Sequence, residues 1–312
     1  MPASTTVLES IGDTPLVQLR QLVPPSCARV VVKLEGANPT GNMKDRMAKT
    51  AIEAAVRDGR LRPGGTVVEY TGGSTGASLA LVCAVRGFRC KIVTSDAFSA
   101  EKTRTARAFG AEIVLIRSDA GRITQELINR MIDSARQLSL EPGHWWFDQL
   151  NNEDASRGYH PMGEEIWQQA NGRVDAFVQS VGSAHSLNGV ASVLRERNPD
   201  LYVVAAEPAE SAVLSGRAKG SHRIEGIGIG FIPPAWRPGD VDEIQSATTE
   251  EAAAMCRRLA QEEGVFAGTS SGLNVVAALR VAARLGPLAT VATIMIDSGL
   301  RYLSTEVYRA GG

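Results

Sequence analysis

Residues 38–46 read Asn-Pro-Thr-Gly-Asn-Met-Lys-Asp-Arg, and the lysine in this run is Lys44. The proline and glycine indicate a loop, and Asn42 with Asp45 three residues later resembles a helix N-cap with an acidic partner. Apolar side chains of residues 47–56 then fall on one face of a helix. We therefore expect a loop that leads into a helix, with Lys44 in the first helical turn.

The expected position of Lys44 disfavours its charged form. The positive end of the helix dipole lies at the N-terminus, and Arg46 and Lys49 add positive charge nearby. A lysine whose ammonium form is disfavoured suits Schiff-base chemistry, because the neutral amine is the nucleophile. The alternative is an ordinary exposed lysine near a helix start, and the rest of the chain has to decide between the two.

The length of 312 residues is enough for two packed domains or one large α/β domain. A net charge of −1 without a basic block argues against nucleic acid and anionic membranes as partners. The longest apolar run, residues 77–85, is too short to span a bilayer, and the N-terminus lacks the features of a signal peptide. Four cysteines without a Cys-x-x-Cys pair indicate buried thiols, not disulfides or a metal site. We expect a cytoplasmic protein without a bound metal.

Strands and helices are predicted to alternate along the whole chain. Apolar runs indicate buried strands at residues 29–34, 66–70, 90–94, 113–116, 176–181, 202–206 and 290–296. Besides the helix after Lys44, helical patterns occupy residues 74–86, 101–109, 123–138, a run that ends at 197, residues 250–263, and a run that opens at 270. This alternation is typical of βαβ units on parallel sheets. We predict an α/β protein with two sheets and a cleft between them.

Two glycine-rich turns follow predicted strands and open predicted helices. They are Thr-Gly-Gly-Ser-Thr-Gly at residues 71–76 and Gly-Ser-Ala-His-Ser-Leu-Asn-Gly at residues 182–189. Such turns bind anions because bare backbone N–H groups meet the ligand at the positive end of a helix. A tight connection without a ligand is the plainer interpretation of either turn taken alone.

The first turn also fits a dinucleotide site, since Asp96 lies twenty residues beyond Gly76. A short-chain dehydrogenase would need a tyrosine with a lysine four residues later, and none of the five tyrosines has one. Nor would a dehydrogenase account for the Lys44 loop or the second turn. We therefore disfavour a nicotinamide cofactor.

Several motifs together resemble those of the fold-type II pyridoxal phosphate enzymes, the fold of the tryptophan synthase β subunit, and specifically the cysteine synthase and cystathionine β-synthase family. They are Gly-Asp-Thr-Pro-Leu at 12–16, residues 38–46, the turn at 71–76, Gly-Ile-Gly-Ile-Gly-Phe-Ile-Pro at 226–233, Gly-Thr-Ser-Ser-Gly at 268–272, and residues 297–305. The resemblance implies two α/β domains with pyridoxal 5′-phosphate in the cleft between them. Residues 42–152 would form the small mobile domain, and residues 1–41 with 153–312 the large cofactor-binding domain.

The resemblance also implies roles for single residues. Lys44 is similar to the lysine that binds the cofactor's aldehyde and then serves as the catalytic base. Ser298 matches the residue that faces the pyridine nitrogen, with Asp297 as the alternative. The phosphate-binding turn would consist of Gly182, Ser183, Ala184, His185 and Ser186. The implied substrate-binding residues are Thr71, Gly72, Gly73, Ser74, Thr75, Gln149 and Gly228, and Ser74 also falls where the cofactor's 3′ oxygen is bound.

The implied reaction is β-replacement on an activated L-serine, such as O-acetyl- or O-phosphoserine. It proceeds through an aminoacrylate, to which a thiol or another small nucleophile adds to give cysteine or a related amino acid. A serine opposite the ring nitrogen would leave that nitrogen largely unprotonated, which suits prompt expulsion of a β-substituent. The alternatives are β-elimination, as in a dehydratase or desulfhydrase, and a cofactor-binding regulator without turnover. Relatives further imply a homodimer.

The chain departs from the family pattern at both turns. The family's Thr-Ser-Gly-Asn-Thr-Gly has Gly72 in place of its serine and Ser74 in place of its asparagine here. The family's Gly-Thr-Gly-Gly-Thr becomes a turn with Ala184 and His185. His185 is either a ligand of phosphate or substrate, or a structural histidine. These departures lie where the substrate is chosen, so the sequence indicates the class of reaction better than it indicates the substrate. Three further residues are expected near the cleft without an assigned role: Trp145, Trp146 and His160.

Overall fold

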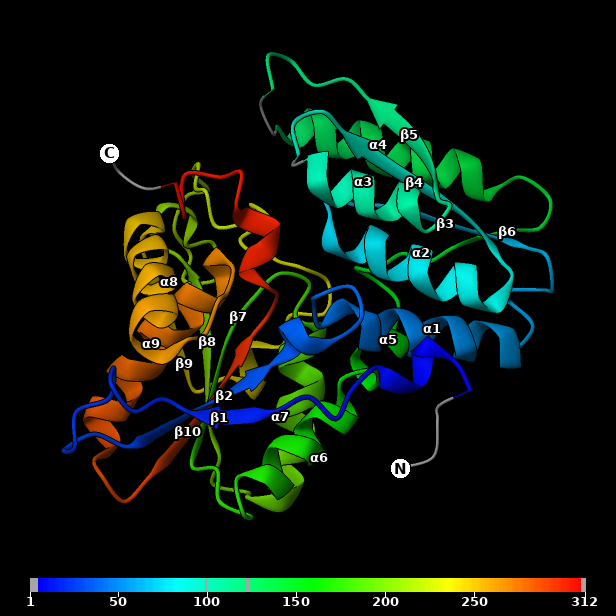
Figure 1. Ribbon diagram of the computed structural model, residues 1–312. Helices are drawn as coiled ribbons and strands as arrows, with labels where there is room; N and C mark the ends of the chain where they lie inside the picture. Colours follow the sequence, from blue (N-terminus) through cyan, green and yellow to red (C-terminus); the bar gives the residue numbers. More distant parts are fainter. Residues whose placement is uncertain (1–4, 99, 122–123, 310–312) are drawn as a thin grey trace. The chain divides into compact units, whose positions relative to one another are not determined.

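Parallel strands form two separate sheets in the computed structural model, which describes residues 5–98, 100–121 and 124–309. The chain divides into two compact units. The first contains the residues up to Ile11 together with Lys44–Gly158, and the second contains Gly12–Met43 together with the chain from Tyr159 onward. Each unit has its own sheet, with helices packed against it (Figure 1).

The first unit is built on a parallel sheet of four strands in the order β5-β4-β3-β6. Its strands are β3 (Thr66–Tyr70), β4 (Arg89–Ser95), β5 (Glu112–Ile116) and β6 (His144–Trp146). Its helices are α1 (Lys44–Arg57), α2 (Ser74–Arg86), α3 (Ala100–Ala108), α4 (Gln125–Ser139) and α5 (Asp154–Arg157), with the 3-10 turn η1 (Val7–Ser10). Val68 and Val93 pack against α4 on one face, and Ile92 faces α2 on the other, because neighbouring strand residues point to opposite faces.

The second unit is built on a sheet of six strands in the order β1-β2-β10-β7-β8-β9, in which only the edge strand β1 is antiparallel. Its strands are β1 (Leu16–Gln18), β2 (Arg29–Leu34), β7 (Ala176–Ser180), β8 (Tyr202–Pro208), β9 (Glu243–Ala247) and β10 (Thr290–Met295). Its helices are α6 (His160–Gln169), α7 (His185–Arg197), α8 (Thr249–Glu263) and α9 (Thr269–Leu285), with the 3-10 turns η2 (Glu35–Ala37), η3 (Ala209–Ser211), η4 (Pro238–Asp240) and η5 (Gly299–Tyr302). Helices α8 and α9 lie on one side of the sheet and α6 and α7 on the other (Figure 1).

The centre of the second unit is buried because its middle strands are covered on both faces. Strands β7 and β10 are buried along their whole length, as expected for parallel strands without a polar face. Helix α9 contributes Leu273, Val276 and Val281 to the same core. Helix α8 is fixed at its start by a capping box between Thr248 and Glu251.

The prediction of an α/β fold with two sheets is confirmed, and the predicted strands are present with ends that shift by at most two residues. The predicted helices are also present. Helix α4 begins at Gln125, and Ile123, where we expected it to start, lies outside the described residues.

Several elements of the structure were not predicted from the sequence: β6, β9, α5 and α6. Strand β6 has only three residues, and β9 reads Glu-Ile-Gln-Ser-Ala at the edge of its sheet, so neither shows an apolar run. Helix α6 begins with His160 and a proline, and a proline at this position is a helix-start signal that we did not use.

All four cysteines are free thiols. Cys83, Cys90 and Cys256 are buried, as expected, whereas Cys27 is only half-buried. Within the described residues, no group of three or more histidine, cysteine, aspartate or glutamate side chains could hold a metal ion. Over the same residues, every helix is too short or too polar to cross a membrane.

Candidate active site

Lys44 is the first residue of α1 and is half-buried, so the prediction that it lies in the first helical turn is confirmed. The helix begins one residue later than a cap at Asn42 implies. The reason is that Met43 donates its N–H to the carbonyl oxygen of Ile296 at 3.0 Å, while Asn42 forms an antiparallel bridge with Asp297. The backbone of residues 42 and 43 is therefore paired with residues 296 and 297, which follow β10, and the helix starts only at Lys44.

Residues 41–43 are therefore fastened alongside the chain that follows β10. Ser298 donates its N–H to the carbonyl oxygen of Gly41 at 2.9 Å. Its hydroxyl oxygen accepts the N–H of Leu300 at 3.3 Å, which leaves the hydroxyl hydrogen to donate elsewhere. Ser298 thus lies beside the loop whose next residue along the chain is Lys44.

The neighbouring carboxylate of Asp297 has a different environment. Its Oδ2 accepts the hydroxyl of Tyr302 at 2.8 Å, and its Oδ1 lies where a side chain on Gly268 would begin. Burial raises the pKa of Tyr302 well above its usual range, so this hydroxyl keeps its proton and remains a donor. These contacts favour Ser298 over Asp297 as the residue available to a ligand.

The turn at residues 182–186 connects β7 to α7, and its backbone is closely packed. A Cβ on Gly182 would stand 2.6 Å from the carbonyl oxygen of Gly226, so only glycine fits at this position. Ala184 has a φ of 69°, in the left-handed region that favours glycine. His185 is buried at the first position of α7, and Gln179 donates its side-chain N–H to the hydroxyl oxygen of Ser186. The N-terminal N–H groups of α7 and the hydroxyl hydrogen of Ser186 are suited to an anion.

Gly228 belongs to an adjacent loop of the same unit. Its N–H donates to the carbonyl oxygen of Val181 at 3.1 Å, and its own carbonyl oxygen lies 2.9 Å from Nε2 of His222. Its φ is 59°, and a Cβ there would meet Pro208 and His222 at 2.7 Å. The loop that contains Gly228 therefore packs against Val181, which leads into the turn at residues 182–186.

The turn at residues 71–76 connects β3 to α2 in the first unit. Gly73 donates its N–H to the hydroxyl oxygen of Thr71 at 3.0 Å, and Thr75 donates its hydroxyl to Oε1 of Gln149 at 2.7 Å. The second contact fixes the orientation of the Gln149 amide, because Oε1 accepts from Thr75 and Nε2 is left as a double donor. Ser74 is the first residue of α2. Thr71–Thr75 and Gln149, which lie far apart in sequence, therefore meet at one edge of the sheet.

Glu69 was not predicted as a site residue, although it supports this group. It is buried in β3, where its Oε1 accepts the N–H of Tyr70 and its Oε2 the N–H of Gln149, both at 3.1 Å. Burial raises the pKa of Glu69 well above its usual range. The only sequence signal was a single acid in an otherwise apolar strand, which does not show what the acid contacts.

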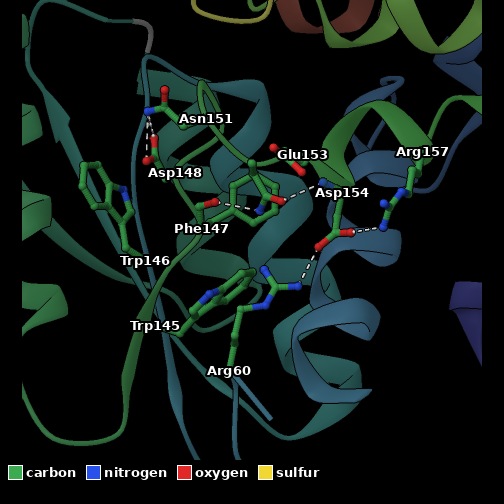
Figure 2. Close-up of a pocket in the computed structure, with 10 residues that line it drawn as sticks. Arg60, Trp145, Trp146, Phe147, Asp148, Asn151, Glu153, Asp154 and Arg157 are labelled. Atoms are coloured by element: carbon green, nitrogen blue, oxygen red, sulfur yellow. Dashed lines mark hydrogen bonds and ion pairs between the residues drawn. The ribbon is translucent and has the colours of Figure 1, made fainter. Parts of the chain in front are cut away.

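Trp145 and Trp146 line a hollow of about 410 Å³ at the surface of the first unit (Figure 2). The guanidinium of Arg60 lies 5.8 Å from the centre of a Trp145 ring and forms an ion pair with Asp154. Gln149 lies in the same stretch of chain, but none of the predicted substrate-binding residues lines this hollow. His160 is exposed at the start of α6.

Comparisons with known proteins identify the family of this chain. A family model described as "Pyridoxal-phosphate dependent enzyme" matches residues 7–297. The chain belongs to the pyridoxal-phosphate-dependent enzymes. The cysteine synthase of Staphylococcus aureus is 40% identical to it over 305 residues, which is 97% of this chain and 96% of the relative.

Two solved structures are similar to this pyridoxal phosphate enzyme over almost its whole length. One is the cysteine synthase (OASS) of Entamoeba histolytica, at 37% identity and a TM-score of 0.89, covering 98% of this chain and 91% of the other. The other is the O-acetylserine-dependent cystathionine β-synthase of Helicobacter pylori, at 34% identity and a TM-score of 0.92, covering 99% of this chain and 100% of the other. The fold-type II resemblance noted in the sequence is confirmed.

The residues present suit pyridoxal phosphate. Gly182 and the start of α7 form a cradle of bare backbone that a side chain would fill, as a phosphate site requires. Ser298 offers a hydroxyl hydrogen of the kind that a pyridine nitrogen accepts. Membership of this family also decides against the dinucleotide interpretation. Asp96 binds the N–H of Ser118 at 2.8 Å, and this contact lowers the pKa of Asp96 to about 2.

Another lysine, Lys33, is fully buried and is poorly suited to binding the cofactor. Nζ of Lys33 lies 2.6 Å from a carboxylate oxygen of Glu165 and donates to Gln169 at 2.8 Å and to the carbonyl oxygen of Thr14 at 2.5 Å. All three donors of its ammonium group are thus occupied, which stabilises the charged and non-nucleophilic form.

Proposed function

We propose that the protein catalyses β-replacement on an activated L-serine, with O-acetyl-L-serine as the first donor to test and a small thiol or sulfide as nucleophile. The observation that carries this proposal is the division of roles at the end of β10. The carboxylate of Asp297 is engaged by Tyr302, whereas Ser298 has a hydroxyl hydrogen to give. A neutral hydroxyl opposite the ring nitrogen favours loss of a β-substituent over a long-lived carbanion. The cysteine synthase and O-acetylserine-dependent relatives support the same reaction.

Bound pyridoxal phosphate supplies the electron sink that acidifies the substrate's Cα proton and lets the β-substituent leave. The residues of this chain then have separable tasks. The turn at 182–186 would hold the phosphate, and Ser298 would set the protonation of the ring nitrogen. The neutral amine of Lys44 would hold the cofactor's aldehyde and afterwards take the proton from Cα.

The first-unit turn would bind and orient the substrate's α-carboxylate. The N-terminal N–H groups of α2 favour an anion. Because Thr75 engages Oε1 of Gln149, both N–H groups of the amide are available as donors to a carboxylate. Glu69 acts as a positioning residue, since it binds the backbone N–H of Gln149 from the buried side.

The test combines cofactor-loaded protein with O-acetyl-L-serine and sulfide, and identifies the products by mass spectrometry. We expect cysteine and acetate, and no reaction above background in Lys44→Ala, whereas Lys49→Ala in the same helix should retain activity. Pyruvate and ammonia in place of cysteine would establish β-elimination. Reduction with borohydride followed by peptide mapping should label Lys44, and a label elsewhere would overturn its assignment.

We further propose that the protein is a cytoplasmic homodimer, and that residues 42–152 act as a small mobile domain against the large domain of residues 1–41 and 153–312. These proposals rest on the family resemblance. Analytical ultracentrifugation of the loaded protein should give twice the chain mass of 33.2 kDa. Closure on the substrate should slow hydrogen exchange in 42–152 when O-acetyl-L-serine is added without nucleophile.

A further inference from the structure

The turn at 71–76 carries an aromatic contact that the family pattern does not suggest. Phe98 lies in the connection after β4, and three atoms of its ring stand 2.7, 2.8 and 3.2 Å from the place where a Cβ on Gly72 would be. Contacts under 3.0 Å are not tolerated by real Cβ atoms, so the ring occupies the space of a side chain at position 72. The glycine and the phenylalanine therefore form a complementary pair.

Sheet geometry explains why these two residues meet although they are far apart in sequence. Strands β3 and β4 are parallel neighbours, with Tyr70 opposite Val93. The connections that follow them consequently leave the same edge of the sheet. Phe98 is held there by its N–H bond to the carbonyl oxygen of Ser95 at 3.2 Å and by packing against the cluster that contains Tyr70 and Val93.

We propose that Phe98 is a specificity-determining residue of the donor site, which keeps position 72 without a side chain and replaces a hydroxyl with an aromatic edge beside the bound α-carboxylate. The proposal deepens the proposed function and rests on it. The carboxylate is then held by the N–H groups of α2 together with the amide of Gln149, which Thr75 orients, without a hydroxyl at position 72. The loop thus binds an amino-acid donor with one hydrogen bond fewer than a serine there would allow.

The pair makes an unusual prediction about a double substitution. In Gly72→Ser, the new side chain meets the ring, so either the ring leaves its packed position or the loop shifts, and we expect donor binding to weaken. In the double variant Gly72→Ser with Phe98→Ala, the space is open and the serine can donate to the carboxylate. The same substitution at position 72 should therefore be harmful with Phe98 present and favourable with Phe98 absent, which independent sites cannot produce.

The experiment is a double-substitution cycle on the cofactor-loaded enzyme, measured by KM and kcat for O-acetyl-L-serine and by Tm. With Phe98 present, Gly72→Ser should raise KM by about tenfold or more and lower Tm by about 3 °C or more. With Phe98→Ala, the same change should lower KM by about threefold or more, with kcat within about twofold. Phe98→Leu, which keeps an apolar contact with the cluster, replaces Phe98→Ala if the latter does not fold.

Phe88→Ala is the matched control, because Phe88 is half-buried and precedes β4 at the opposite end of that strand. Gly72→Ser should have the same effect in this background as in the wild type. Equal effects of Gly72→Ser with and without Phe98, on KM and on Tm, would overturn the proposal even in an active enzyme.

Failure of the proposed function has a different signature. If the wild type does not convert O-acetyl-L-serine, the cycle is measured instead through the dissociation constant of L-cysteine, followed by the visible absorption of the bound cofactor. The sign reversal should persist in that constant if Phe98 governs carboxylate binding, and its absence there would reject the role of Phe98.

Discussion

The turns at 71–76 and 182–186 look alike in sequence, since each follows a parallel strand and opens a helix of 13 residues. They differ in what makes them specific. The first relies on side chains, because Thr75 orients Gln149 and Phe98 covers Gly72. The second relies on backbone shape, since Gly182 is pressed against the carbonyl oxygen of Gly226. The difference matches the proposed ligands. The turn at 182–186 would bind the cofactor's phosphate, which is the same in every reaction, so a rigid backbone is enough. The turn at 71–76 would bind the substrate, which has to be distinguished from other amino acids by side chains.

The largest effect is expected where backbone shape is violated. In Gly182→Ala, the added Cβ would lie 2.6 Å from the carbonyl oxygen of Gly226. We expect the dissociation constant of pyridoxal phosphate to rise by a factor of about 100, and the free energy of unfolding to fall by about 1–3 kcal/mol. Absorbance titration and thermal unfolding measure the two. Gly239→Ala is the control, as a Cβ there meets nothing within 4 Å. Unchanged cofactor affinity would contradict the proposal that the turn at 182–186 holds the phosphate.

A smaller effect, confined to the substrate, should follow from removing the oriented amide. Gln149→Ala takes away the amide that Thr75 orients, and one hydrogen bond from it to a charged carboxylate is worth about 1.5–3 kcal/mol. We expect KM for O-acetyl-L-serine to rise by about 10–100-fold with little change in cofactor affinity. Asn151→Ala, whose amide binds Asp148, should change neither constant. If Gln149→Ala weakened the cofactor equally, the separation of the two turns would be wrong.

The buried acid beneath the first turn should give a pH signature. Burial raises the pKa of Glu69 in the folded protein, so the folded state holds this proton more tightly than the unfolded chain does. Stability from this group is complete below its ordinary pKa of about 4.3. It is lost as pH rises from there toward the folded pKa, by about 1.4 kcal/mol for each pH unit. Unfolding by urea between about pH 4 and pH 9 should therefore show a decline that Glu69→Gln reduces. Glu112→Gln, on an exposed side chain, should leave the decline intact.

The smallest effect is expected from relieving strain in the second turn. Ala184 has a φ of 69°, a conformation that costs about 1–2 kcal/mol for a residue with a Cβ. Because Ala184→Gly also removes a buried methyl worth about 0.8 kcal/mol, we expect a net gain in stability of up to about 1 kcal/mol. Thermal unfolding resolves such a change. A loss of more than about 1 kcal/mol would mean that the methyl group, and not the turn, dominates.

The sequence was sufficient for much of the fold because the strongest elements carry local signals. Strand β10 consists of apolar and β-branched residues only, and helix α8 begins at its capping box and ends at Gly264 in the left-handed conformation. Strand β6 was missed because His-Trp-Trp has no period, and its pairing with β3 is what makes it a strand. Local propensity contains no information about such partners.

The candidate site divides in the same way. The glycine turns and Lys44 could be found from spacing and from the family resemblance, since their position between a strand and a helix is a local property. The contact of Phe98 with Gly72 and the bond from Gln149 to Glu69 depend on which strands are neighbours. They become visible only when the sheet order is known.

The contact between Gly182 and Gly226 also bears on engineering of this scaffold. The two glycines belong to segments 44 positions apart, and the carbonyl oxygen of Gly226 leaves no room for a side chain on Gly182, whereas a Cβ on Gly226 would meet nothing within 4 Å. Replacing residues 182–186 alone with the corresponding turn of a homologue would therefore place the new turn against a Gly226 segment to which it is not complementary. A chimera that exchanges both segments as a single cassette has the better prospect of folding.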